Sequence, residues 1–126
     1  MRKALGLFVF FLVLALAGGC GKQESTQEAN KRITIAVIPK GTMHEFWKTV
    51  HAGAVKASRE LDVDIIWKGP IKEDDRDAQI AVVEDFISKG VSGIVLAPLD
   101  DTALRTPVAS ATKGGMPVVK RSKDDA

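Results

Sequence analysis

The chain has 126 residues, 18 of them basic and 16 acidic, with one cysteine and two histidines. This length allows one small domain. The formal net charge of +2 comes entirely from Arg2 and Lys3, and the other basic and acidic residues balance. The composition therefore argues against nucleic-acid binding and against an electrostatic grip on a membrane.

Residues 1–19 have the pattern of a secretory signal. Arg2 and Lys3 precede an uncharged apolar run from Ala4 to Ala17, which suits the apolar region of a signal peptide. A helix of about 14 residues rises only ~21 Å, short of the ~30 Å hydrocarbon core of a bilayer. The small residues that end the run suit cleavage by a signal peptidase.

The only cysteine, Cys20, follows this signal directly. An odd cysteine in an exported protein cannot form an internal disulfide. Its position resembles a bacterial lipobox, which implies a diacylglycerol thioether on Cys20 and cleavage before it. Lipoboxes usually carry leucine three residues earlier, where this chain has Ala17, with Leu16 one residue further back. A plain signal peptide and an uncleaved membrane anchor remain the alternatives.

Residues 21–31 are polar and include no large apolar side chain. Such a segment has too little apolar surface to fold. We expect residues 20–32 to form a lipidated cysteine with a flexible tether.

The first strand is expected at residues 33–38, a β-branched apolar run that Pro39 ends. A helix should follow from Met43 to Leu61, because apolar residues recur there at helical spacing. Its apolar face would consist of Phe46, Val50, Ala54, Ala57 and Leu61. A second strand is expected at residues 63–67.

The charged segment 72–77 is expected to be a solvated loop. Either Asp74 or Asp75 can cap the second helix, since a carboxylate there meets unsatisfied N–H groups. Gly90 should end this helix. Its apolar stripe would consist of Ile80, Val83, Phe86 and Ile87.

A third strand is expected at residues 94–97, followed by a helix that Asp100 or Asp101 can cap and that runs to about Lys113. Residues 116–119 should begin a fourth strand. The order βαβαβαβ predicts an α/β fold with a parallel sheet and right-handed crossovers.

Ligands of such sheets bind beyond the carboxyl ends of the strands. The loop after the first strand carries Lys40, His44 and the adjacent aromatics Phe46 and Trp47. Successive helical side chains diverge by ~100°, so at least one aromatic should face the crevice. A flat aromatic face suits the C–H-rich face of a sugar ring, and the polar neighbours could bond its hydroxyls. In the alternative, Phe46 packs in the core and Trp47 covers a strand edge.

The loop after the third strand carries Asp100 and Asp101. A carboxylate accepts two hydroxyl hydrogens at once, which is a common way to hold a polyol. One aspartate of the pair is expected to cap the following helix, which leaves the other to bind a ligand.

Several kinds of site lack their motif. No GxGxxG follows the first strand, and neither a GxxxxGK[ST] loop nor a GxSxG elbow is present. His44 and His51 have no evident third partner, so no metal site is expected. No cofactor is predicted.

Residues 33–119 resemble the N-terminal lobe of ribose-type periplasmic sugar-binding proteins, the solute receptors of ABC importers. The pieces that carry the resemblance occur in order along the chain: ITIAVIPKG, HEFWKTVHAGAVKA, QIAVVEDFISKGVSGIVLAPLDDTAL and GGMPVV. The resemblance implies part of the N-terminal lobe of a type 1 periplasmic binding protein. It also implies an exported, lipid-anchored, non-enzymatic protein that captures a monosaccharide or similar polyol for an ABC permease.

The resemblance implies a ligand-binding set by position: Lys40, His44, Phe46, Trp47, Asp100 and Asp101. Phe46 and Trp47 fall where the family places two aromatics that flank the sugar. His44 falls where many members have a hydrogen-bonding asparagine, and Asp100 falls at a carboxylate that bonds sugar hydroxyls.

Members of this family have two lobes that close on the ligand, whereas this chain ends in the polar segment 120–126. The resemblance therefore implies a truncated receptor, and we expect the chain alone to bind sugar weakly or not at all.

Two other functions remain open. The same lobe could present a ligand to a membrane sensor. A small exported hydrolase would need a nucleophile and a base, for which Thr42 and His44 are the nearest candidates. A transcriptional repressor is excluded, because no helix-turn-helix precedes Ile33 and an export signal does.

Overall fold

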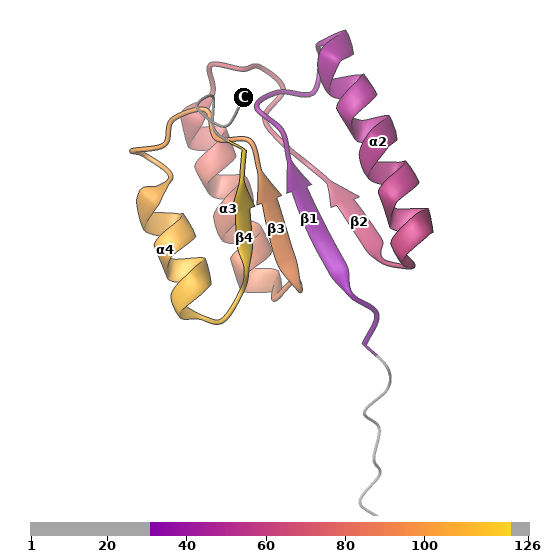
Figure 1. Ribbon diagram of the computed structural model, residues 1–126. Helices are drawn as coiled ribbons and strands as arrows, with labels where there is room; N and C mark the ends of the chain where they lie inside the picture. The colour runs from indigo at the N-terminus through magenta and orange to yellow at the C-terminus, as the bar shows by residue number, and fades with distance from the viewer. Residues whose placement is uncertain (1–30, 122–126) are drawn as a thin grey trace, which may run out of the picture. The chain divides into compact units, whose positions relative to one another are not determined.

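The computed structural model describes residues 31–121, which form four strands and three helices in alternation (Figure 1). The elements are β1 (Thr34–Ile38), α2 (Glu45–Leu61), β2 (Asp64–Trp67), α3 (Arg76–Lys89), β3 (Gly93–Leu96), α4 (Arg105–Lys113) and β4 (Val118–Lys120). The predicted α/β order is confirmed. The expected signal, Cys20, most of the tether and residues 122–126 lie outside the described residues.

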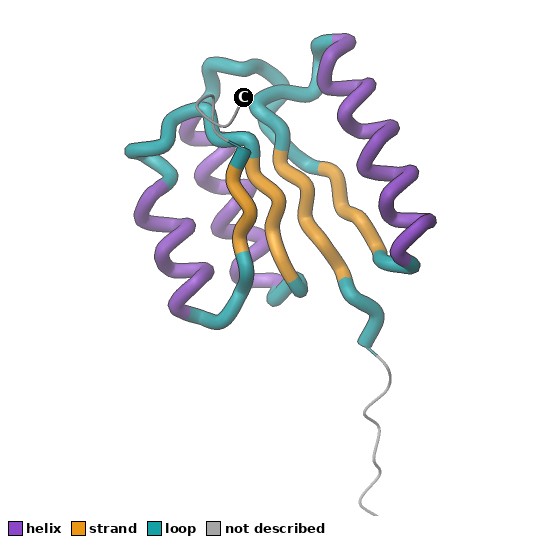
Figure 2. Tube along the Cα trace, in the orientation of Figure 1, coloured by secondary structure: helices purple, strands orange, loops and turns teal. Residues whose placement is uncertain are grey.

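The strands form one parallel sheet in the order β2-β1-β3-β4 (Figure 2). In the register, Ile35 lies between Ile65 of β2 and Gly93 of β3, and Ile94 pairs with Val118. All four carboxyl ends therefore meet at the same edge of the sheet, as the alternating order predicts.

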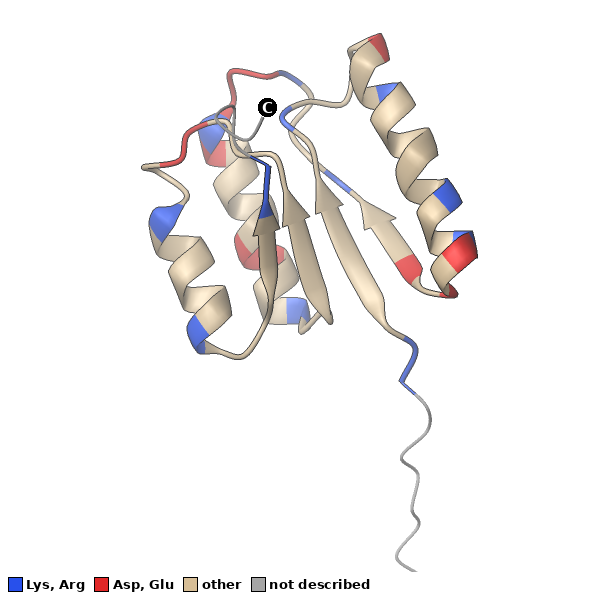
Figure 3. Ribbon diagram, viewed as in Figure 1, with Lys and Arg blue, Asp and Glu red and all other residues tan. Residues whose placement is uncertain are grey.

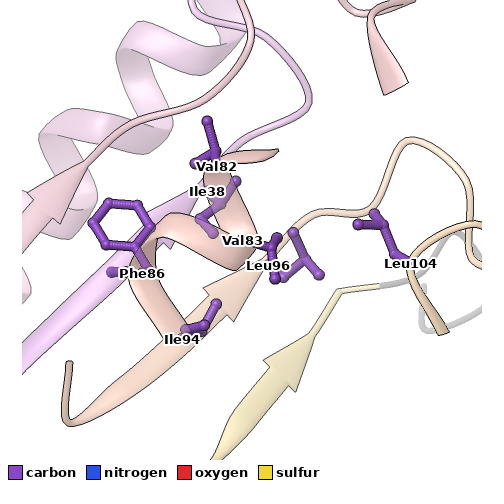
Figure 4. Packing of buried hydrophobic residues seen from close by; sticks show 8 residues of the cluster. Ile38, Val82, Val83, Phe86, Ile94, Leu96 and Leu104 are labelled. Atoms are coloured by element: carbon purple, nitrogen blue, oxygen red, sulfur yellow. The ribbon is translucent and has the colours of Figure 1, made fainter. Parts of the chain in front are cut away.

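The main core lies between α3 and the two central strands (Figure 4). Side chains alternate along a strand, so alternate residues of β1 and β3 point to the same face. Their apolar side chains pack against α3, and Leu104 closes the cluster. The cluster consists of Ala36, Ile38, Val82, Val83, Phe86, Ile94, Leu96 and Leu104.

Helix α2 covers the opposite face of the sheet. The imidazole of His51 stacks on Trp67 of β2, with ring centroids 4.6 Å apart and planes 15° apart. Trp67 pairs with Val37, whose neighbours on β1 point into the α3 core. Alternation therefore places α2 and α3 on different faces.

The predicted apolar face of α2 is wrong at Phe46, Val50 and Leu61, whereas Ala54 and Ala57 are half-buried. Phe46 and Leu61 are 65% and 70% exposed, whereas Trp47 is only 9% exposed. The helix packs on the edge strand β2, so it covers a narrow part of the sheet. Trp47 and His51, one turn apart, turn inward in place of Phe46 and Val50.

The predicted ends of α3 are confirmed. Asp75 precedes the helix, and its carboxylate accepts a hydrogen bond of 3.0 Å from the N–H of Ala78. Gly90 follows it with φ of 64°, a left-handed conformation that favours glycine.

Helix α4 begins later than predicted. Asp100 caps a turn over residues 101–104 rather than the helix, which starts at Arg105 after Leu104. Leu104 is buried in the core, and the extra turn brings it there. Strand β4 is also shifted, since Lys120, expected in the polar tail, pairs with Leu96.

Truncating a core leucine should destabilise the fold far more than truncating an exposed one. Leu96 is fully buried and Leu61 is 70% exposed. We expect Leu96→Ala to lower the free energy of unfolding by about 2–5 kcal/mol, because it leaves a cavity between β3 and α3. Leu61→Ala should change it by less than about 0.5 kcal/mol. Urea unfolding followed by circular dichroism measures both, and equal midpoints would contradict this core.

Candidate functional site

Three loops gather beyond the carboxyl ends of the strands: residues 39–44, 68–75 and 97–104 (Figure 2). Many of the acidic and basic residues lie on these loops, whereas β1 and β3 carry no charged residue (Figure 3). The edge of the sheet where ligands of this fold bind is therefore also its most polar edge.

The two adjacent aromatics have different environments. Phe46 is 65% exposed, and its ring meets the ring of Trp47 edge-on, with centroids 4.9 Å apart. The indole N–H of Trp47 donates a hydrogen bond of 2.7 Å to the Oε1 of Glu73. The alternative in which Phe46 packs in the core is therefore wrong, and Trp47 is the buried member of the pair.

The first two loops pack closely against each other. The N–H of Thr42 donates to the carbonyl of Ile71, and its hydroxyl donates to the carbonyl of Pro70, both at 3.4 Å. A Cβ at Gly41 would lie 2.7 Å from the Cγ of Glu73, so this position leaves no room for a side chain. Residues 72–77 are exposed, as predicted, and Glu73 among them also accepts the hydrogen bond from Trp47.

A cavity of about 440 Å³ opens between these two loops. Its lining residues are Met43, His44, Ile71, Lys72, Glu73 and Asp74. His44 is exposed and precedes α2 without capping it through its side chain. Lys40 lies half-buried on the first loop.

Asp100 is the aspartate that caps. Its Oδ1 accepts hydrogen bonds from the N–H groups of Thr102 and Ala103, both at 2.9 Å. Its Oδ2 accepts one of 2.9 Å from the guanidinium of Arg76. The bond from Ala103 and the pairing with Arg76 lower the pKa of Asp100 below its ordinary value. One aspartate does cap, but it caps the turn before α4 rather than the predicted helix. This aspartate is also the one that the resemblance assigns to the sugar.

Asp101 lies beside β4. Its Oδ1 is 3.5 Å from the ammonium of Lys120. Both aspartates therefore have ionic partners, and both partners come from segments outside the predicted ligand set.

Gln79 is the buried polar residue that the sequence reading missed. Its side chain is completely buried. Its Nε2 donates to the carbonyls of Pro39 and Ala97, both at 2.9 Å, and its Oε1 accepts from the N–H of Leu99 at 2.8 Å. The signal was available, because Gln79 shares a helical face with Val82, Val83 and Phe86.

A second, mostly apolar cavity of about 480 Å³ lies over the sheet beside α2. It is lined by Val37, Ile38, Pro39, Phe46, Trp47, Val50, Trp67, Val95, Leu96, Ala97, Val119, Lys120 and Arg121. Phe46 and Trp47 are thus brought together with strand residues on the face that α2 leaves uncovered.

Two negative findings concern the described part of the chain. No three His, Cys, Asp or Glu side chains there come together in a way that could hold a metal ion. None of its helices is long and apolar enough to span a bilayer.

Residues 35–124 match the family model of the periplasmic binding protein domain. The chain belongs to this family. It is 35% identical over 95 residues to the D-ribose/D-allose-binding protein of Pseudomonas aeruginosa, an alignment that covers 73% of this chain. The resemblance to ribose-type periplasmic binding proteins is therefore confirmed.

Solved structures of the family agree with the fold. An ABC transporter solute-binding protein from Actinobacillus succinogenes with bound D-allose superimposes with a TM-score of 0.68 and 28% identity, over 71% of this chain. One from Agrobacterium vitis bound with α-D-tagatopyranose gives a TM-score of 0.67 and 31% identity, also over 71%. The chain spans only 30% of the Pseudomonas protein and 31% and 30% of these two structures.

Replacing Arg76 should raise the pKa of Asp100 toward its ordinary value. The rise should be incomplete in Arg76→Gln, because the hydrogen bond from Ala103 is the larger cause of the lowered pKa. A carboxyl group with a lowered folded-state pKa stabilises the fold above its unfolded-state pKa. This contribution is lost as the pH falls through the folded-state value.

The carboxyl carbon of Asp100, followed by NMR from pH 2 to 7, measures this shift. Arg59→Gln, on an exposed part of α2, serves as the control and should leave the titration unchanged. An Asp100 pKa that is the same in Arg76→Gln as in the wild type would contradict the pairing.

Proposed function

We propose that this chain captures a monosaccharide or similar polyol at the carboxyl edge of its sheet, as part of a solute receptor for an ABC importer. Membership of the periplasmic binding protein family carries this proposal. It is supported by the printed names of similar proteins, which bind D-ribose or D-allose, D-allose and α-D-tagatopyranose. Two thirds or more of each of these proteins has no counterpart in the chain, so its contribution to the receptor is partial.

Phe46 is the proposed stacking surface for the sugar ring. Its ring is 65% exposed and rests edge-on against Trp47. The hydrogen bond between Trp47 and Glu73 fixes the supporting ring. Burying the exposed face of Phe46 under the C–H groups of a sugar would remove apolar surface from water at little cost in flexibility.

Asp100 is the proposed hydroxyl acceptor of the third loop. Its Oδ2 lies beside the guanidinium of Arg76, and the pKa of the carboxyl group, already acidic, is lowered further, so the group is ionised at neutral pH. An ionised carboxylate accepts stronger hydrogen bonds from hydroxyls than a neutral group does. Lys40 and His44 are proposed to contribute donors from the first loop, and Asp101 a further acceptor.

We propose binding without catalysis. The proteins to which the chain is similar are binding proteins by name. The hydroxyl of Thr42 donates to the carbonyl of Pro70 rather than to His44, so the nearest nucleophile and base do not form a pair. This geometry speaks against the hydrolase alternative.

We also propose that residues 1–19 direct export, that Cys20 carries the lipid and that residues 20–32 tether the folded part 33–119 to the membrane. The support is the sequence pattern described above, together with membership of a periplasmic family.

Sugar binding should appear as saturable shifts of backbone amide signals in an NMR titration with D-allose or D-ribose. The shifts are expected in the loops at residues 39–47 and 97–104, because these carry the proposed contacts. We expect a Kd of about 1 mM or weaker, since the chain spans only 30% of the Pseudomonas protein. Shifts confined to other parts of the chain would place the site elsewhere, and no shifts up to ~50 mM sugar would refute binding by this chain.

Phe46→Ala should weaken this binding about tenfold or more while preserving the fold, because Phe46 is mostly exposed. Leu61→Ala removes an equally exposed apolar side chain from the other end of the same helix. It should leave the affinity unchanged. Equal affinities in the two variants would remove Phe46 from the site.

Lipidation should depend on Cys20. In bacterial cells fed an alkyne-tagged palmitate, the wild-type chain should incorporate the label and fractionate with membranes. Cys20→Ser should do neither, because its oxygen cannot form the thioether. Label retained in Cys20→Ser would contradict anchoring through this residue.

A further inference from the structure

Pro39 directly follows β1, and Pro98 follows β3 after one residue, Ala97. The last hydrogen bond of the ladder runs from the N–H of Ala97 to the carbonyl of Ile38, at 3.0 Å. Proline has no N–H, so neither Pro39 nor Pro98 can donate a backbone hydrogen bond. The loops that lead to Phe46 and to Asp100 separate at this point.

The side-chain amide of Gln79 lies where the ladder stops. Its two donors reach one carbonyl on each loop, Pro39 and Ala97, and its oxygen accepts from Leu99. The side-chain amide of glutamine has two N–H donors and one oxygen with two lone pairs. The three hydrogen bonds use both donors and one of the two lone pairs. Only one orientation of the amide satisfies these three partners. A helix side chain therefore takes the place of the missing backbone partners.

We propose that Gln79 is a positioning residue for the ligand site, which holds the two ligand loops at a fixed separation without touching the ligand. This inference rests on the proposed function. The affinity of the site for a polyol then depends on a side chain that lies beneath it. No contact of Gln79 with solvent or ligand is needed, since its exposed fraction is zero.

The other link between α3 and the third loop is a weaker type of interaction. Arg76 and Asp100 form an ion pair whose side chains are 61% and 30% exposed, so water and salt screen it. One hydrogen bond of Gln79 is buried and two are partly buried, and removing them would leave two carbonyls and one N–H without these partners. The separation of the loops is thus set mainly by Gln79.

Loops that are already ordered favour binding, because they lose their conformational entropy on folding rather than on binding. A sugar that must bond to two loops at once would otherwise restrict both of them on binding. Loss of the amide should therefore weaken sugar binding more than an equal loss of stability elsewhere in α3 does.

The test compares Gln79→Met with Val82→Ala, both on the buried face of α3. Gln79→Met keeps the length of the side chain and removes its hydrogen bonds, whereas Val82→Ala weakens the core and removes no side-chain hydrogen bond. Two quantities are measured under conditions where each variant is folded: hydrogen exchange of the Leu99 amide, and the Kd for D-allose by NMR.

In Gln79→Met we expect exchange of the Leu99 amide to rise at least tenfold and the Kd to rise about tenfold. In Val82→Ala, exchange at Leu99 should rise no more than global stability requires, and the Kd should change by less than about twofold. Equal effects of the two variants on both quantities would overturn the inference.

Gln79→Glu tests hydrogen bonding separately from packing. Its affinity and its Leu99 protection should depend on pH only if hydrogen bonds hold the loops. A protonated carboxyl group has one donor and one acceptor, whereas a carboxylate has no donor. Near pH 8 this variant should resemble Gln79→Met, and near pH 5 it should recover part of the affinity and of the Leu99 protection, because burial against two carbonyls favours the protonated form. Absence of this recovery, with the variant folded at both pH values, would count against positioning by hydrogen bonds.

The outcomes separate the two proposals. If the wild type shows no sugar-induced shifts, the proposed function fails and the affinity claim fails with it. If the wild type binds sugar but Gln79→Met binds equally well, only the positioning role fails.

Discussion

The hydrogen-bonded ladder between β1 and β3 ends at the bond from Ala97 to Ile38, and the loops beyond it need other partners for their backbone groups. Gln79 supplies three of these partners from within α3. The same helix packs Val83 and Phe86 on the central strands. Core packing and loop geometry thus depend on one helix, because the apolar stripe that seats α3 also brings the amide to the end of the ladder.

The second loop and the first residue of α3 make further links at this edge of the sheet. Glu73 accepts from the buried indole of Trp47, and Arg76 reaches Asp100 on the third loop. In this structure, charged side chains that the sequence predicts to be solvated link the loops to neighbouring segments. The two aromatic residues have different environments. The hydrogen bond of its indole N–H fixes Trp47, whereas Phe46 has an exposed ring.

The two faces of the sheet are covered unequally. Helices α3 and α4 bury the face that carries Ile94 and Leu96, whereas α2 packs on β2 and leaves Val95 and Val119 39% and 63% exposed. This asymmetry explains why the predicted apolar stripe of α2 is displaced. A helix seated on an edge strand needs only a narrow inward face, and Phe46 and Val50 then border the apolar cavity over the uncovered strands.

The sequence alone determined the βαβαβαβ order, the parallel sheet, a cap at Asp74 or Asp75 and the stop at Gly90, because periodicity, capping and glycine conformation are local properties. It also placed the candidate residues on two loops of the same edge. Only the tertiary structure decided which aromatic is buried, that Asp100 pairs with Arg76 and that Gln79 joins the two loops. Those outcomes depend on contacts between residues 18 to 40 positions apart, which chain folding creates and no local pattern encodes.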